Sequence, residues 1–100
     1  MSFTSTIIKW KIFVLDKPEP HLQISFEFAD GLLVKNLHLR HPHRKHTIKF
    51  LSDINASGSF RTLDDLQSII KAANFRPVSV EWAYNQQGDK QIIKIFCQYS

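Results

Sequence analysis

Residues 22–28 alternate strictly between apolar and polar side chains, and this pattern limits the chain to folds that contain a half-buried β-strand. Apolar residues occupy every second position, so they share one face of an extended strand, whereas a helix would spread them around its axis. The apolar positions are Leu22, Ile24, Phe26 and Phe28. The polar positions are Gln23, Ser25 and Glu27. The first set should face a core and the second set solvent.

The dipeptide Asp30–Gly31 follows this strand and predicts a tight hairpin turn. A type I′ turn needs positive φ at both central residues, which aspartate and glycine tolerate. Such a turn pairs Ala29 with Leu32 and starts a third strand that continues to Leu39. The expected pairs are Phe28–Leu33, Ile24–Leu37, Leu22–Leu39 and Gln23–His38. Apolar partners then meet apolar ones, which supports this register.

The remaining elements predict an α+β domain. Thr62 and Asp65 approximate a capping box, and an apolar stripe follows them (Leu63, Leu66, Ile69, Ile70 and Ala73). The expected strands cover residues 5–15, 22–28, 32–39, 46–51, 78–84 and 90–99, and the expected helix covers residues 63–73. The predicted order is β-β-β-β-α-β-β, an antiparallel β-sheet with one helix packed on it, in a single domain of residues 1–100. Whether the last hairpin joins that sheet stays open.

The single cysteine, Cys97, excludes an internal disulfide and fits a reducing compartment. Lys9 and Lys11 interrupt the apolar stretch near the N-terminus, so no signal-peptide pattern is present. No segment approaches the roughly 18 apolar residues of a membrane span. We therefore expect a cytoplasmic protein without a membrane partner.

Net positive charge is concentrated in one segment. The chain has 13 Lys and Arg against 9 acidic residues, a formal charge of +4. Residues 31–52 contain five of these cations and no acid, so the rest of the chain is slightly negative. Four of the five histidines lie in the same segment. Such a segment favours anionic partners, either nucleic acid or an acidic protein surface.

Within this segment, residues 40–46 read RHPHRKH and predict the tip of a second hairpin. The spacing of His41, His43 and His46 superficially resembles a metal site. However, Pro42 turns the first two imidazoles away from each other, and the neighbouring cations would repel Zn²⁺. We expect no metal and no cofactor. Protonation of the histidines should strengthen anion binding at low pH.

These observations predict a small, basic, non-enzymatic protein that contacts the phosphate backbone of nucleic acid through the histidine-, arginine- and lysine-rich hairpin. The candidate binding residues are His38, Arg40, His41, His43, Arg44, Lys45, His46 and Lys49. The first alternative is a protein–protein interaction module that uses the same hairpin or a sheet edge. The second is a ribonuclease-like enzyme based on His38 and Glu27. The oligomeric state stays open.

Overall fold

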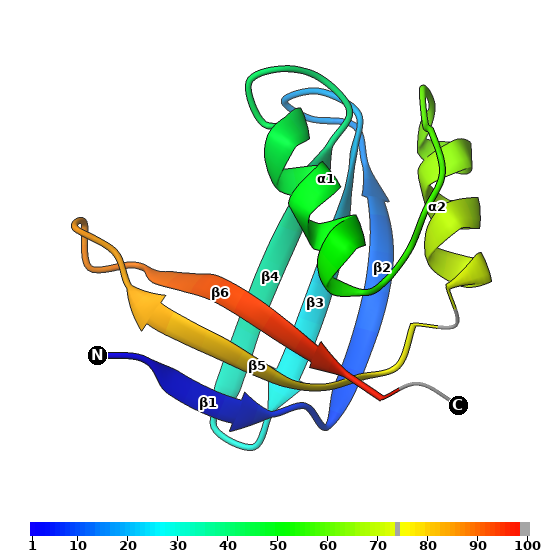
Figure 1. The fold of residues 1–100 in the computed structure, drawn as a ribbon. Helices are drawn as coiled ribbons and strands as arrows, with labels where there is room; N and C mark the ends of the chain where they lie inside the picture. The colour runs from blue at the N-terminus through cyan, green and yellow to red at the C-terminus, as the bar shows by residue number, and fades with distance from the viewer. Residues whose placement is uncertain (74, 99–100) are drawn as a thin grey trace.

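The alternating residues form the central strand of a three-stranded antiparallel sheet in a computed structural model that describes residues 1–73 and 75–98. This first sheet has the strand order β2 (Lys9–Leu15), β3 (His21–Phe28) and β4 (Gly31–His38). A second antiparallel sheet has the order β1 (Phe3–Thr6), β5 (Pro77–Tyr84) and β6 (Lys90–Cys97). The helices are α1 (Arg44–Asp53) and α2 (Leu63–Ala72). The predicted α+β class is confirmed, but there are two sheets and two helices (Figure 1).

The apolar face of β3 lies in the hydrophobic core, as its alternation predicts. Leu22, Ile24, Phe26 and Phe28 are all buried. The other elements contribute to the same core, among them Phe50 from α1, Leu66 and Ile70 from α2, Val80 from β5 and Ile95 from β6. The two sheets cross each other with this core between them, and both helices lie beside the first sheet (Figure 1).

The predicted register between β3 and β4 is wrong by two residues, although its assignment of faces is correct. Phe28 pairs with Gly31, so the turn consists of Ala29 and Asp30. Neither Asp30 nor Gly31 has the positive φ that a type I′ turn requires. A slip of two residues preserves the alternation of faces, whereas a slip of one would reverse it.

The predicted strand over residues 5–15 is divided between the two sheets. The backbone N–H of Ile7 donates to the carbonyl of Val78 in β5, and the N–H of Ile8 donates to the carbonyl of Glu27 in β3, both at 2.8 Å. Adjacent residues therefore bond to different sheets. No proline or glycine marks this crossing, so the sequence reads as one continuous strand.

The predicted strand over residues 46–51 is wrong, because this segment lies within α1. A helix buries Thr47, Phe50 and Leu51, which are three and four residues apart, and also Ile54 just beyond its end. No side chain caps the helix N-terminus, where His43 is the N-cap residue. The local sequence therefore lacks the usual start signal. Residues 40–46 accordingly form a turn and the first residues of α1, and not the tip of a hairpin.

The one helix that the sequence predicts, over residues 63–73, is confirmed as α2 (Leu63–Ala72). The Thr62 side chain accepts a hydrogen bond from the Asp65 N–H at 3.1 Å, and the Asp65 side chain accepts one from the Thr62 N–H at 3.2 Å. These two bonds complete the expected capping box. Leu66 and Ile70 form the buried centre of the predicted apolar stripe.

The last hairpin belongs to the second sheet, where β5 pairs with β1 on one side and with β6 on the other. Trp82 pairs with Phe3 and Ile92, and Tyr84 pairs with Lys90. The far end of the predicted last strand, at Tyr99, lies outside the described residues. Among the described residues, no helix is long and apolar enough to cross a membrane.

Candidate anion-binding groove

A groove runs between α1 and two edge strands, β4 of the first sheet and β6 of the second. It consists of two adjoining hollows of about 290 and 320 Å³. Four residues line both hollows, namely Lys35, His46, Gln91 and Ile92. We call this feature the basic groove, because its ionisable lining is mostly cationic. The lining includes Lys35, Lys49, Lys90, Lys94, His38, His43, His46 and one acid, Asp53.

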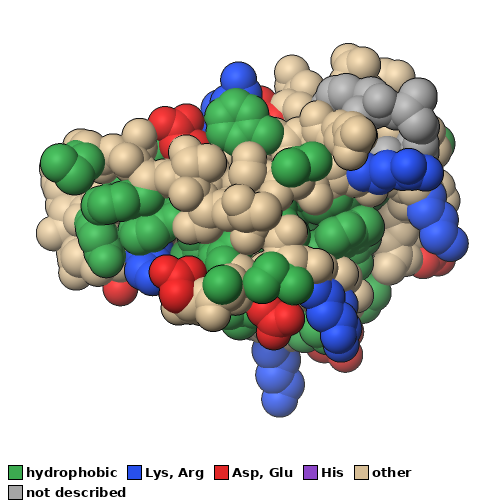
Figure 2. Space-filling model, turned by 90° about the horizontal axis from the view of Figure 1, so that it is seen from below, with side chains coloured by type: hydrophobic (Ala, Val, Ile, Leu, Met, Phe, Trp, Pro, Cys, Tyr) green, Lys and Arg blue, Asp and Glu red, His purple; other side chains and the backbone are tan. Residues whose placement is uncertain are grey.

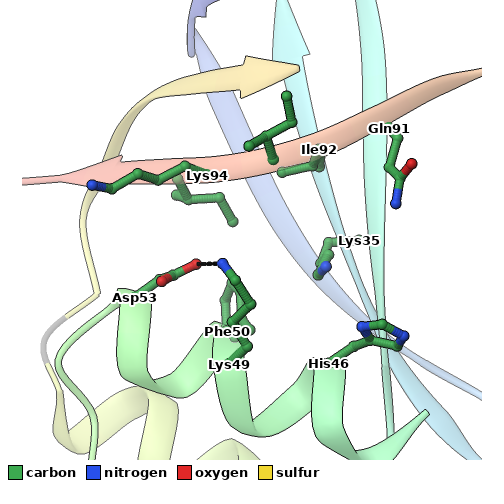
Figure 3. Close-up of a pocket in the computed structure, with 10 residues that line it drawn as sticks. Lys35, His46, Lys49, Phe50, Asp53, Gln91, Ile92 and Lys94 are labelled. Carbon is green, nitrogen blue, oxygen red and sulfur yellow. Dashed lines mark hydrogen bonds and ion pairs between the residues drawn. The ribbon is translucent and has the colours of Figure 1, made fainter. Parts of the chain in front are cut away.

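Lys35 lies at the centre of the groove. It points from β4 toward α1, where His46 and Lys49 face it (Figure 3). Burial is the main factor that lowers the pKa of Lys35, and the nearby charge of Lys49 lowers it further, while Asp53 opposes the shift. Lys49 forms an ion pair with Asp53 at 3.2 Å. The charge of Lys35 is therefore poorly solvated, and an anion in the groove would stabilise it.

A row of four histidines leads into the groove from β3. The ring centroids of His21 and His38 lie 4.8 Å apart, those of His38 and His43 lie 5.2 Å apart, and those of His43 and His46 lie 6.1 Å apart. The last three of these residues line the groove. The row joins residues that are up to 25 positions apart in sequence, from His21 to His46.

Two members of this row resist protonation. Burial is the main cause of the lowered pKa of His38, and His21 and His43 lower it further, whereas Glu19 opposes the shift. Burial also lowers the pKa of His46, with additional repulsion from Lys35, Lys45 and His43. Both imidazoles are therefore more often neutral near pH 6 than a solvated histidine would be.

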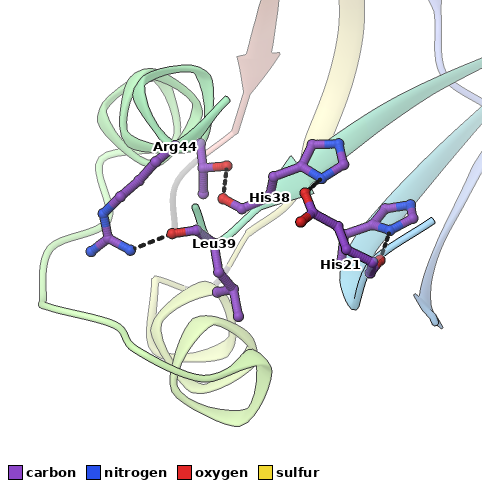
Figure 4. A network of polar contacts seen from close by, with 6 residues as sticks. His21, His38, Leu39 and Arg44 are labelled. Atoms are coloured by element: carbon purple, nitrogen blue, oxygen red, sulfur yellow. Dashed lines mark hydrogen bonds and ion pairs between the residues drawn. The ribbon is translucent and has the colours of Figure 1, made fainter. Parts of the chain in front are cut away.

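The predicted pair of His38 and Glu27 does not form. Glu27 pairs with Leu32, six residues before His38 on β4, which separates the two by about 20 Å along the strand. The carboxylate near His38 is instead that of Glu19, with Oε1 3.4 Å from Nδ1 (Figure 4). This Nδ1 atom is buried and has no hydrogen bond among the described residues.

Arg44 supports the fold, although the sequence suggests a binding role. Its guanidinium donates to the carbonyl of Leu39 at 2.7 Å and to the carbonyl of Phe60 at 3.0 Å. It also lies 4.0 Å from the centroid of the Phe60 ring. Figure 4 shows the side chain turned toward the backbone that precedes α1. Its donors are thus directed at protein atoms.

The other predicted residues divide between the groove and the open surface. His38, His43, His46 and Lys49 line the groove, where His38 is half-buried and the other three are exposed. Arg40, His41 and Lys45 are also exposed but do not line the groove. The residues selected from the sequence do not include Lys35, or Lys90 and Lys94, which come from a distant strand. The alternation of β4 places Lys35 on the face of Leu33 and Leu37, which was the available signal for an inward lysine.

No group of three or more histidine, cysteine, aspartate or glutamate side chains in the described part of the chain is arranged to hold a metal ion. The row of imidazoles therefore does not form a ligand set. Cys97 is half-buried, and burial raises the pKa of its thiol to about 11. At neutral pH this thiol is protonated and a weak nucleophile.

No protein-family model matches the chain, and searches of curated proteins and of solved structures found no significant match. The chemistry of the basic groove is therefore the basis for a functional assignment.

Proposed function

We propose that this protein binds the phosphate backbone of nucleic acid in the basic groove and acts without catalysing a reaction. The observation that carries the proposal is the convergence of four lysines and three histidines, from β4, α1 with its N-cap residue, and β6, on one groove that contains a single acid. Lysine ammonium groups bind phosphate oxygens and release the counterions condensed on nucleic acid. We also propose a cytoplasmic location, where such a partner is present.

The state of Lys35 supports an anionic ligand. A half-buried ammonium group beside another lysine is electrostatically strained, and its lowered pKa reflects that strain. A phosphate placed between Lys35 and Lys49 would relieve the repulsion. The electrostatic attraction would also be stronger there than at an open surface, because the local dielectric is lower. Lys35 and Lys49 are therefore the proposed primary contacts.

The exposed cations Arg40 and Lys45 have a different proposed role. They lie on the same basic segment but do not line the groove. Charges of this kind raise the rate at which an anion encounters the protein and add little to the bound state. Mutation of these residues should therefore slow association more than it weakens equilibrium binding.

The test is a salt series with two double variants of equal charge. One variant combines Lys35→Gln and Lys49→Gln in the groove, and the control combines Lys45→Gln and Lys71→Gln, which are exposed on α1 and α2. Fluorescence anisotropy would measure binding to single-stranded DNA, RNA and random duplex from low to physiological salt. The wild type should bind with micromolar Kd at low salt and show a steep salt dependence. The groove variant should lose about two units of salt slope, and the control should lose less.

Other outcomes would contradict the proposal. Equal losses in the two double variants would show that net charge matters and the groove does not. No binding of any nucleic acid by the wild type at low salt would exclude the proposal altogether. Groove-dependent binding of polyglutamate without nucleic-acid binding would favour an acidic protein partner. Release of labelled RNA fragments during the assay, lost in a His38→Ala variant, would instead indicate a ribonuclease.

A further inference from the structure

Three aromatic side chains gather at the end of the second sheet that bears the N-terminus. Phe3 stacks on Trp82 with ring centroids 4.6 Å apart, and Tyr84 meets both rings edge-on at 6.1 and 5.4 Å. The Trp82 Nε1–H donates to Ser5 Oγ at 3.0 Å, which fixes the indole ring. Tyr84 is nevertheless 57% exposed and Phe3 39% exposed. We call Phe3, Trp82 and Tyr84 the aromatic cluster.

Figure 2 views the molecule from below and shows hydrophobic side chains at several places on this face, with lysines, arginines and acids among them. No histidine is visible on that face, because the histidine row lies toward the opposite end of the first sheet. The exposed rings and the imidazoles therefore occupy separate parts of the surface. An extended ligand could reach both, because the imidazoles of His38, His43 and His46 line the groove and Lys90 lines it beside the rings.

Lys90 connects the aromatic cluster to the basic groove. Its Nζ lies 4.8 Å from the centroid of the Trp82 ring, and it pairs with Tyr84 across the β5–β6 hairpin. The same lysine lines the groove together with His38, His43 and His46. It also lines a small hollow together with Trp82 and Ser5. Lys90 thus lies beside both the aromatic cluster and the cationic groove.

From this arrangement we infer that the ligand of the basic groove is single-stranded nucleic acid, with one or more bases stacked on Tyr84 and Phe3 and the adjoining phosphates beside Lys90 and Lys35. The inference rests on the proposed function. An unpaired base offers a free π-face to an exposed ring, and such stacking tolerates every base. Bases in a duplex are already stacked on each other, so a duplex could use only the groove.

The test distinguishes the contribution of base stacking to the affinity from that of phosphate charge. It compares Kd values for a fluorescein-labelled oligo-dT, an abasic backbone of the same length and charge, and a duplex. Tyr84→Ala should weaken oligo-dT binding about tenfold, because stacking contributes on the order of 1–3 kcal/mol per base. It should leave the other two Kd values unchanged. Tyr84→Phe keeps the ring and should retain wild-type affinity. Circular dichroism would verify that each variant is folded.

A second measurement does not depend on replacing Tyr84. In a Trp10→Phe variant, Trp82 is the sole tryptophan, and oligo-dT should quench its fluorescence more than the abasic backbone does at equal occupancy. The inference is overturned if Tyr84→Ala leaves the affinity for oligo-dT unchanged or lowers that for the abasic backbone equally. Binding of the abasic backbone under those results would leave the proposed function intact. Failure of all three probes to bind would overturn both.

Discussion

The two helices have the same length of ten residues but are specified in different ways. α2 has its signals in its own sequence, with a capping box at Thr62, two acids in the first turn and Lys71 in the last. α1 has no capping side chain, no acid in its first turn and no basic residue in its last. Its first turns are held by bonds to residues outside the helix, from Arg44 to Leu39 and Phe60 and from Thr47 to His38.

This difference has a functional consequence, because α1 is the helix that lines the basic groove. His46 and Lys49 lie on the side of α1 that faces β4 and β6, while Thr47 and Arg44 anchor the helix to the end of β4. The position of the groove therefore depends on contacts between elements. α2 is specified mostly by its own sequence, and it packs against the core without lining the groove.

Removal of the Arg44 anchor should produce the largest change in stability. Arg44→Ala deletes two charge-assisted hydrogen bonds to backbone carbonyls, so the free energy of unfolding should fall by about 3 kcal/mol. Arg40→Ala removes the same charge four residues earlier from an exposed side chain and should change it by less than about 0.5 kcal/mol. Urea denaturation followed by circular dichroism would compare the two. Similar losses would mean that α1 is not anchored through Arg44.

The contrast between the helices explains which parts of the fold were predictable. The strict alternation in β3 and the capping box of α2 are local signals, and both lead to the observed structure. Residues 46–51 fit a strand as well as a helix, since Ile48 and Phe50 alternate while Thr47, Phe50 and Leu51 have helical spacing. Tertiary contacts that the sequence does not reveal decide between the two. The crossing at Ile7 and Ile8 was equally hidden.

A smaller loss of stability is expected when one threonine in the first turn or cap of each helix is replaced. Thr47 is fully buried, and its hydroxyl donates to the His38 carbonyl at 2.7 Å. Thr47→Val leaves that carbonyl without its partner and should cost about 2 kcal/mol. Thr62→Ala removes an exposed helix cap and should cost about 1 kcal/mol. Urea denaturation would measure both costs.

The two threonine variants should also differ in function. Thr47→Val loosens α1 against β4 and should weaken binding of single-stranded DNA, whereas Thr62→Ala should leave the Kd unchanged at temperatures where both variants are folded. Anisotropy titrations at low salt would determine the Kd values. If Thr62→Ala weakened binding as much as Thr47→Val, groove geometry would depend on overall stability and not on the anchoring of α1.

The candidate site was predictable only where it is continuous in sequence. The basic segment of residues 31–52 includes Lys35, Lys49 and three of the groove's histidines, so charge patterning located one wall. Lys90 and Lys94 lie in a region whose charges balance, and they join the groove because β6 is the edge of a separate sheet. The sequence suggests that Arg44 binds a ligand, but its guanidinium donates to two backbone carbonyls. The sequence shows where the charged residues are, whereas the fold determines which of them can contact a ligand.

The smallest expected effects are on the pH dependence of stability. The histidine row and the α2 cap should contribute to it in different pH ranges. The folded state lowers the pKa of His38 and His46, so it binds fewer protons than the unfolded chain. Stability should therefore fall as pH decreases from about 7 through the ordinary histidine pKa near 6.5.

At α2, backbone N–H groups of Arg61 and Thr62 lower the pKa of Asp65, so its contribution is present above its ordinary pKa and is lost as pH falls through the lower, folded value. Urea denaturation at a series of pH values should reveal two separate limbs. His38→Gln should reduce the slope of the near-neutral limb, with the remainder contributed by His46, and Asp65→Asn should reduce the slope of the acidic limb. A near-neutral limb unchanged in His38→Gln would show that burial of His38 does not contribute to the pH dependence of stability.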